Sequence, residues 1–287
     1  MKAIYKRELK AYLTNMLGYV FIAVNLIIVG IYFTYYNLNY AYPYIDYTLS
    51  GTSFIFMITT PLLTMRAMSD ERRQKTDQLL LTAPVDPWQI VVGKYLALVT
   101  VYLIPIVIIG FYPLMLTSFG TVYLKEAYTT LFGFFMMGCA YLALGLFISS
   151  TTDSPVLSAV VTFIACFLVY MASSVSSFFS DTSFATYIAL AAIIALLALL
   201  IYSMVKNQVI AVGFFIVLFA ALTVCFFVKP ALLEGGIQVI IEVFDFSSRF
   251  DDFLNGIFSV TSLVYYISAI VVCCTLAVQS IQKRRWS

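Results

Sequence analysis

Long apolar stretches alternate with short polar ones along the whole chain. A helix that crosses a lipid bilayer needs about 20 mostly apolar residues, and eight stretches approach this length: 17–36, 50–68, 89–114, 129–149, 155–175, 185–205, 208–228 and 258–280. Pro61 interrupts the second stretch, which is tolerated where neighbouring helices satisfy the carbonyl that a proline frees. The pattern predicts an all-α, polytopic membrane protein with about eight transmembrane helices and a single transmembrane domain over residues 1–287.

The basic residues are distributed unequally between the two sides that eight crossings define. One side carries both termini and 13 of the 16 lysines and arginines, and Lys125, Lys229 and Arg249 remain on the other side. Because cytoplasmic loops are enriched in lysine and arginine, we expect the N- and C-termini in the cytoplasm. Six crossings would keep the same asymmetry, and the pair within 185–228 would then be the one that does not cross.

Composition excludes several classes of function. The chain is 62% hydrophobic and 10% charged, against about 25% charged residues in soluble domains, so lipid must cover part of the surface. The absence of histidine excludes histidine-based catalytic triads and most zinc sites. The five cysteines lie in apolar stretches without metal-ligand spacing, no GxxxxGK[ST] phosphate loop occurs, and the net charge is only +2. We therefore expect no metal site, no cofactor held by this chain and no nucleic-acid partner.

Three stretches at the ends of the spans carry patterns of their own. Residues 1–16 combine apolar positions at helical spacing with lysines on another face, which fits either an amphipathic helix in the inner membrane interface or simple anchoring by positive charge. Six tyrosines crowd residues 35–47 and fit an interfacial aromatic belt, with an aromatic ligand site as the alternative.

The third stretch, residues 239–257, predicts an external amphipathic helix. Its apolar positions recur at intervals of four and three residues and include Phe246, Phe250 and Phe253, whereas Arg249 lies on the opposite face. Gly256 follows as a break before the last span. We expect this helix to lie on the outer surface, either packed as a lid or against lipid.

The loop at 69–88 is the most distinctive polar segment. A charged part is followed by three leucines and a proline that ends the helix, and Asp86 and Pro87 fit the N-cap and the first turn of the third span. Exposed leucines in the cytoplasm require a cover from lipid, from the chain itself or from a partner. The residues concerned are Asp70, Glu71, Arg72, Arg73, Lys75, Thr76, Asp77, Gln78, Leu79, Leu80, Leu81, Thr82 and Pro84.

This loop resembles the coupling segment of type-2 ABC exporter permeases, in particular the gliding-motility and nitrous-oxide-accessory branch. Gly93-Lys94 at the start of the third span, the turn at 141–155 and the stretch at 244–269 with Tyr265 are similar to the same family. Two positions depart from it, because Lys75 stands where glycine is usual and Gln78 where an acid is usual. The resemblance covers residues 1–175 and 240–287, so that 185–228 reads as a helix pair inserted into a six-helix core.

The resemblance implies a mechanism and a set of partners. Two permease chains pair as a homodimer or heterodimer in a prokaryotic cytoplasmic membrane, and each docks a coupling helix into a cytoplasmic ATPase subunit that binds ATP and Mg²⁺. The leucines would then be covered by the ATPase, and an external accessory protein would find a docking surface at 239–257.

Two other classes of function remain open at this point. A secondary transporter or channel that works alone is compatible with eight spans, but such transporters usually bury a carboxylate in the membrane. Asp153 is the nearest candidate, and its surroundings read as a solvated cytoplasmic turn. A membrane scaffold or a small intramembrane enzyme is the third class, and the enzyme is disfavoured by the lack of a clustered catalytic pair.

Overall fold

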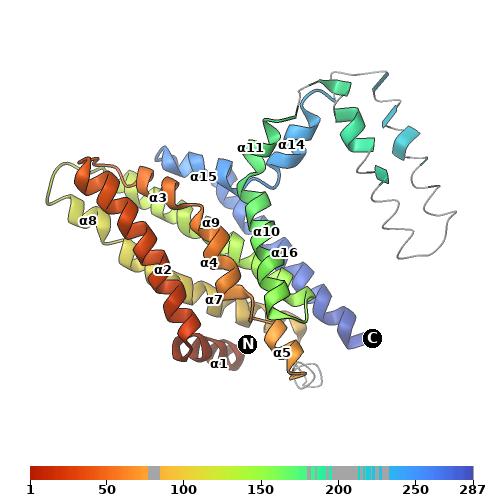
Figure 1. Ribbon diagram of the computed structural model, residues 1–287, viewed down its shortest axis with the longest axis horizontal. Coiled ribbons are helices and arrows are strands. Elements are labelled where there is room, and N and C mark those ends of the chain that lie inside the picture. The colour runs from red at the N-terminus through yellow and green to blue at the C-terminus, as the bar shows by residue number, and fades with distance from the viewer. Residues whose placement is uncertain are drawn as a thin grey trace. The chain divides into compact units, whose positions relative to one another are not determined.

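Every regular element in the part of the chain that the structure describes is a helix (Figure 1). The structure is a computed structural model that describes residues 1–76, 85–179 and 233–286, with scattered residues between 182 and 227. The helices are α1 (Lys2–Thr14), α2 (Met16–Phe33), the π-helix η1 (Thr34–Asn39), α3 (Asp46–Thr52), α4 (Ile55–Thr64), α5 (Ser69–Arg73), α7 (Pro87–Ile109), α8 (Tyr112–Leu116), α9 (Leu124–Thr151), α10 (Pro155–Tyr170), α11 (Ala172–Ser176), α14 (Gly236–Glu242), α15 (Phe246–Leu254) and α16 (Val260–Trp286).

Four of the described helical segments are long and apolar enough to cross a membrane. They are Met16–Asn39, Pro87–Leu116, Leu124–Thr151 and Val260–Arg284. A fifth span results if Asp46–Thr52 and Ile55–Arg73 cross together, although they are bent by 58° relative to each other. The apolar helix α10 is shorter, with 16 residues. The multi-pass helical architecture is therefore confirmed. The eight-span count stays a prediction, because most of the expected pair at 185–228 lies outside the described residues.

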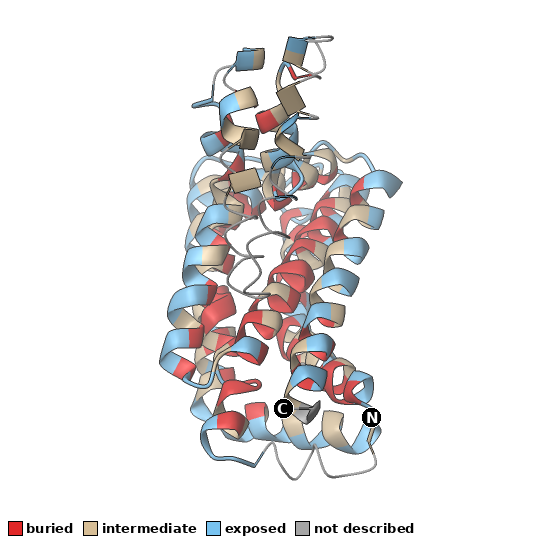
Figure 2. Cartoon of the chain, turned by 90° about the vertical axis from the view of Figure 1, so that its right-hand side faces the viewer, coloured by how far each residue is buried: buried red, intermediate tan, exposed pale blue. Residues whose placement is uncertain are grey.

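The chain divides into two compact units, one of residues 1–170 with 246–287 and one of residues 171–245. Within the first unit, α1, α5 and both termini lie at one end, and η1, α3, α8 and α15 lie at the other (Figure 1). Buried residues line the facing sides of its helices and exposed residues their outer sides (Figure 2). Termini at one end agree with an even number of crossings, and their cytoplasmic location stays a prediction.

Helix α9 is the central helix of the first unit. In its apolar span 72% of the residues are buried, against 39% or less in the other three long spans. Small residues allow this enclosure, because a Cβ at Gly133, Gly138 or Gly145 would lie within 2.6 Å of a side chain from α15, α7 or α4, respectively. Small-residue faces of membrane helices let two helices approach closely, whether within one chain or between subunits. The structure shows that these glycines face the chain's own helices.

The stretch at 239–257 forms two helices rather than the single one expected. Helix α14 ends at Glu242 and α15 begins at Phe246, and the two belong to different units. Asp245 stands directly before α15, and aspartate favours helix starts over helix interiors. Val239 and Val243, which continue the apolar pattern, are mostly exposed. Only the second half of the pattern therefore marks a buried helix face.

The apolar face of α15 packs onto the first unit's own helices. Phe246, Phe250 and Phe253 are buried, with ring contacts to Tyr141 and Phe134 of α9. The Tyr266 hydroxyl of α16 donates a hydrogen bond of 2.7 Å to the carbonyl oxygen of Phe246. The aromatic face of this helix is therefore packed on the chain's own helices, and its location on the outer side stays a prediction.

The second unit contains α11 and α14, which pack against each other. The amide nitrogen Nε2 of Gln238 donates to the Phe179 carbonyl oxygen at 2.8 Å. Gly235 has a φ of +68°, a left-handed conformation that favours glycine, directly before the first residue of α14.

Replacing Gly138 with alanine should destabilise the first unit by about 1–3 kcal/mol, because an added methyl group overfills the site. Its Cβ would lie 2.4 Å from the Tyr102 hydroxyl oxygen and ring Cζ. Thermal unfolding in detergent measures the loss. Gly120→Ala is the matched control, since nothing lies within 4 Å of that Cβ. An equal loss for Gly138→Ala in a Tyr102→Ala background would contradict the explanation, since the truncated side chain leaves room for the methyl group.

Candidate functional site

The described part of the expected coupling segment forms the short helix α5 and a turn after it. Asp70, Glu71, Arg72 and Arg73 lie in α5, and Lys75 and Thr76 lie in the turn. The acidic pair occupies the first turn and the basic pair the last, which is the favourable order for the helix dipole. Predicted residues outside the described part of the chain are Asp77, Gln78, Leu79, Leu80, Leu81, Thr82 and Pro84.

Side chains from other helices satisfy the backbone at the break between α4 and α5. The Ser149 hydroxyl of α9 accepts hydrogen bonds from the backbone amides of Met68 and Ser69, at 3.1 and 3.3 Å. The Tyr12 hydroxyl of α1 donates to the Leu63 carbonyl oxygen at 3.3 Å. Unpaired backbone groups are costly where water is scarce. These bonds therefore hold the start of α5 in place against α1 and α9.

Lys94 of α7 is the centre of a buried charge cluster. Its ammonium group lies 3.0 Å from Glu8 Oε1 of α1 and 2.9 Å from Glu71 Oε2 of α5, and it donates to the Ala67 carbonyl oxygen at 2.7 Å. The Lys94 side chain is 2% exposed. Arg7 forms ion pairs with both carboxylates. We call Arg7, Glu8, Glu71 and Lys94 the Lys94 cluster, and it joins α1, α5 and α7.

The close packing of α1 on α7 brings Glu8 within ion-pair distance of Lys94. A Cβ at Gly93 would lie 3.3 Å from the Ile4 side chain, so the glycine lets the two helices approach. The hydrogen bond with Glu8 raises the pKa of Arg7, which keeps the guanidinium charged. The Gly93-Lys94 pair therefore has two physical roles: Gly93 allows the close approach of the helices and Lys94 pairs with the carboxylates. Glu8 was not predicted from the sequence, because no local pattern indicates that it pairs with Lys94.

Arg72 makes a second junction, on the other side of α5. Its guanidinium donates to the Ser280 hydroxyl of α16 at 3.3 Å, and Nη1 lies 3.8 Å from Asp153 Oδ1. Ser280 in turn donates to the Ser150 carbonyl oxygen at 2.7 Å, and Arg284 pairs with Asp153. Two adjacent residues of α5, Glu71 and Arg72, thus connect it to different sets of helices.

The turn after α5 places Lys75 in a left-handed conformation, with a φ of +58°. The Thr76 amide bonds to the Glu71 carbonyl oxygen at 2.9 Å and the Lys75 amide to that of Arg72 at 3.0 Å, which is the Schellman pattern of helix ends. Glycine suits this position best. The resemblance expected glycine here, and the structure supplies the physical reason.

Helix α7 starts where the sequence predicted. Asp86 is its N-cap, and the side chain accepts a hydrogen bond of 3.1 Å from the Trp88 amide, with Pro87 as the first helical residue. This cap sets the register of α7 and thereby the position of Lys94, which lies two turns further on.

The predicted external residues have different surroundings. Phe246, Phe250 and Phe253 are buried, and the Arg249 guanidinium lies over the Tyr265 ring at 5.4 Å from its centroid. Gly256 has a φ of +70° after the last turn of α15, as a helix stop requires. An outside partner therefore cannot reach the three phenylalanines while α15 stays closed.

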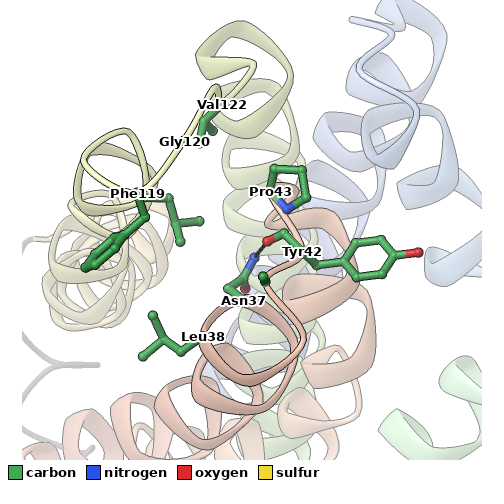
Figure 3. A pocket seen from close by; sticks show the side chains of 9 residues that line it. Asn37, Leu38, Tyr42, Pro43, Phe119, Gly120 and Val122 are labelled. Carbon is green, nitrogen blue, oxygen red and sulfur yellow. Dashed lines mark hydrogen bonds between the residues drawn. The ribbon is translucent and has the colours of Figure 1, made fainter.

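The tyrosine-rich loop borders a small cavity of about 360 Å³ at the same end (Figure 3). Asn37 is buried beside it and donates to the carbonyl oxygens of Tyr42 and Tyr44, at 2.8 and 2.9 Å. Its side-chain oxygen accepts from Thr48 at 2.7 Å. Since these bonds hold the loop and the lining carries no charged side chain, the cavity offers a ligand little beyond apolar contact.

The geometry defines a polytopic membrane protein whose Lys94 cluster and Arg72 junction lie at the end that carries both termini. A family model described as ABC-2 family transporter protein matches residues 9–186, more than half of the chain. The chain belongs to this family, and it is therefore a multi-pass membrane component of an ABC transporter, a permease. No protein with a curated description matches it.

Replacing Lys94 with methionine should destabilise the chain by about 3 kcal/mol, because removing one partner leaves buried carboxylates without their cation. Unfolding in detergent against a denaturant series measures the loss. Arg66→Gln is the control, since Arg66 and Asp70 form an exposed pair at 3.6 Å that should contribute less than about 1 kcal/mol. Equal losses in the two variants would contradict a special role for the buried pair.

Replacing Lys75 with glycine should stabilise the turn by about 1 kcal/mol, because glycine adopts the left-handed conformation without strain. Hydrogen exchange of the Thr76 amide reports on the turn directly, and its protection should rise. Lys75→Ala removes the same charge but keeps the strain. If alanine increased the protection as much as glycine does, the charge and not the backbone would be responsible.

Proposed function

We propose that this permease is the membrane-spanning subunit of a type-2 ABC exporter in a prokaryotic cytoplasmic membrane, and that residues 69–88 couple it to a separate ATPase. The ATPase would bind ATP and Mg²⁺, for which this sequence has no phosphate loop. Membership of the ABC-2 family supports the proposal, because permeases of this family generally pair with an ATPase and dimerise. The gliding-motility and nitrous-oxide-accessory branch is the part of the family that the sequence motifs favour.

The observation that carries the proposal is the double attachment of α5. Through Glu71 it is tied to α1 and α7, and through Arg72 to α16. A push on the segment that follows α5 would therefore reach three helices, including two of the long spans. A generic surface loop would have no need for buried ion pairs at its base.

Asp153 supports this function over ion-coupled transport by the chain alone. Asp153 lies in the turn between α9 and α10, and its side chain is 68% exposed. It pairs with Arg284 of α16. A carboxylate that binds and releases a coupling ion is expected near the middle of the membrane. The exposed position of Asp153 fits a solvated turn.

A second permease chain completes the transport path in this proposal, and an external accessory protein would contact α15. Because the aromatic face of α15 is buried on its own helices, such a partner would meet the opposite face of α15, or would displace the helix. We make no choice between a homodimer and a heterodimer of permease chains.

The decisive experiment is a pull-down of the tagged chain from its own host in mild detergent. The wild-type chain should bring down an ATPase with a phosphate-binding loop. Changing Leu79, Leu80 and Leu81 together to serine should reduce the recovered ATPase at least about tenfold, since each leucine that the ATPase covers would contribute roughly 1.5–3 kcal/mol to the contact.

The control changes three exposed apolar residues at the other end of the first unit, Leu114, Met115 and Phe119, to serine. This variant should keep the ATPase. Failure to recover any ATPase with the wild-type chain in several detergents would refute the proposal. Full recovery with the leucine variant would refute the coupling role of these residues.

A further inference from the structure

A cavity of about 470 Å³ with cationic residues in its lining lies beside α5, at the end of the first unit that carries both termini. It is bounded by α5, the last turn of α9 and the C-terminal part of α16. The residues that line it are Arg72, Thr151, Leu276, Gln279, Ser280, Lys283 and Arg284. The Arg72 side chain is 5% exposed, so the cavity has a cation built into its inner wall.

One face of α16 runs from the cavity along the helix and changes from polar to apolar with distance from the helix end. Val272, Leu276, Gln279 and Lys283 follow one another at intervals of four, three and four residues, and all four are exposed. The first two are apolar and the last two polar. Such a change within a helical turn is expected where a helix leaves hydrocarbon and enters the headgroup layer. The cavity therefore sits at the level of lipid headgroups.

The donors in the cavity are of the type that binds phosphate. Three of the seven lining residues are cationic and none is acidic, and arginine in particular forms paired hydrogen bonds with phosphate oxygens. Asp153 lies next to the lining, paired with Arg284 and 3.8 Å from Arg72 Nη1. A phosphate that entered the cavity would thus share Arg72 and Arg284 with the Asp153 carboxylate, which is itself mostly exposed.

We infer that this cavity binds the headgroup of an anionic phospholipid, with the acyl chains along Val272 and Leu276. Basic pockets between transmembrane helices on the cytoplasmic side are known to hold such headgroups. A free anion would use the same cations but would gain nothing from the apolar half of the α16 face. The lipid would contact Arg72, a residue of the coupling segment, but the inference goes beyond the proposed function and its test needs no ATPase.

The test measures the thermal unfolding midpoint of the full chain in neutral detergent while phosphatidylglycerol is added. The lipid should raise the midpoint, whereas phosphatidylcholine with the same acyl chains should not. In the variant Lys283→Gln with Arg284→Gln, the half-saturating concentration of phosphatidylglycerol should rise about thirtyfold, since each of the two cations contributes roughly 1 kcal/mol near a lipid surface and each 1.4 kcal/mol corresponds to a tenfold change. The single variant Lys283→Gln, which leaves the Arg284–Asp153 pair intact, should show a smaller rise in the same direction.

The matched control is Lys2→Gln with Lys6→Gln, which removes two exposed charges from α1 at the same end of the unit. It should respond to phosphatidylglycerol as the wild type does. An equal loss in the control, or an equal response to phosphatidylcholine, would overturn the site. Stabilisation by soluble glycerol 3-phosphate at the same concentration would overturn the lipid assignment in favour of a free anion.

Discussion

The buried ammonium group of Lys94 is the constraint on which the end of the first unit that carries both termini depends. A charge that is 2% exposed is tolerable only with partners in place, and its three oxygen partners come from α1, from the break after α4 and from α5. Helix α7 can therefore reach its final position only together with these three segments. Helix α5 is consequently part of the folded core of this end, although it has only five residues.

A second constraint acts on the same place through the backbone. The chain must leave α4 and start α5 next to the membrane, where carbonyl and amide groups need partners. Tyr12 and Ser149 supply them from α1 and α9. Helix α9 can come this near because Gly145, one turn before Ser149, has no side chain to collide with Thr64 of α4. Close packing and hydrogen bonding thus reinforce each other at the base of α5.

Local signals in the sequence were sufficient for features that depend on neighbouring residues. Asp86 with Pro87 predicted the start of α7, Gly256 predicted the end of α15, and the spacing of the phenylalanines predicted the buried face of α15. Pairings across the chain left no such signal: Glu8 and Lys94 are 86 positions apart, and Arg72 and Ser280 are 208 apart. Lys94 was counted only as a cytoplasmic charge and part of a family motif, because burial of a lysine depends on helices that pack against it.

The two ends of the first unit are held by different forces, and this difference bears on how force could pass through it. Attraction between charges declines gradually with distance, whereas packed rings lose about a quarter to a half of their attraction once a gap of about 0.5–1 Å opens between them. Small displacements of α5 would therefore stretch the Lys94 cluster and the Arg72 junction without releasing them. At the other end, α15 is held by rings packed against α9 and α16, whose attraction falls off more steeply with separation. Such an arrangement favours graded movement of α5 and a more abrupt loss of contact at α15.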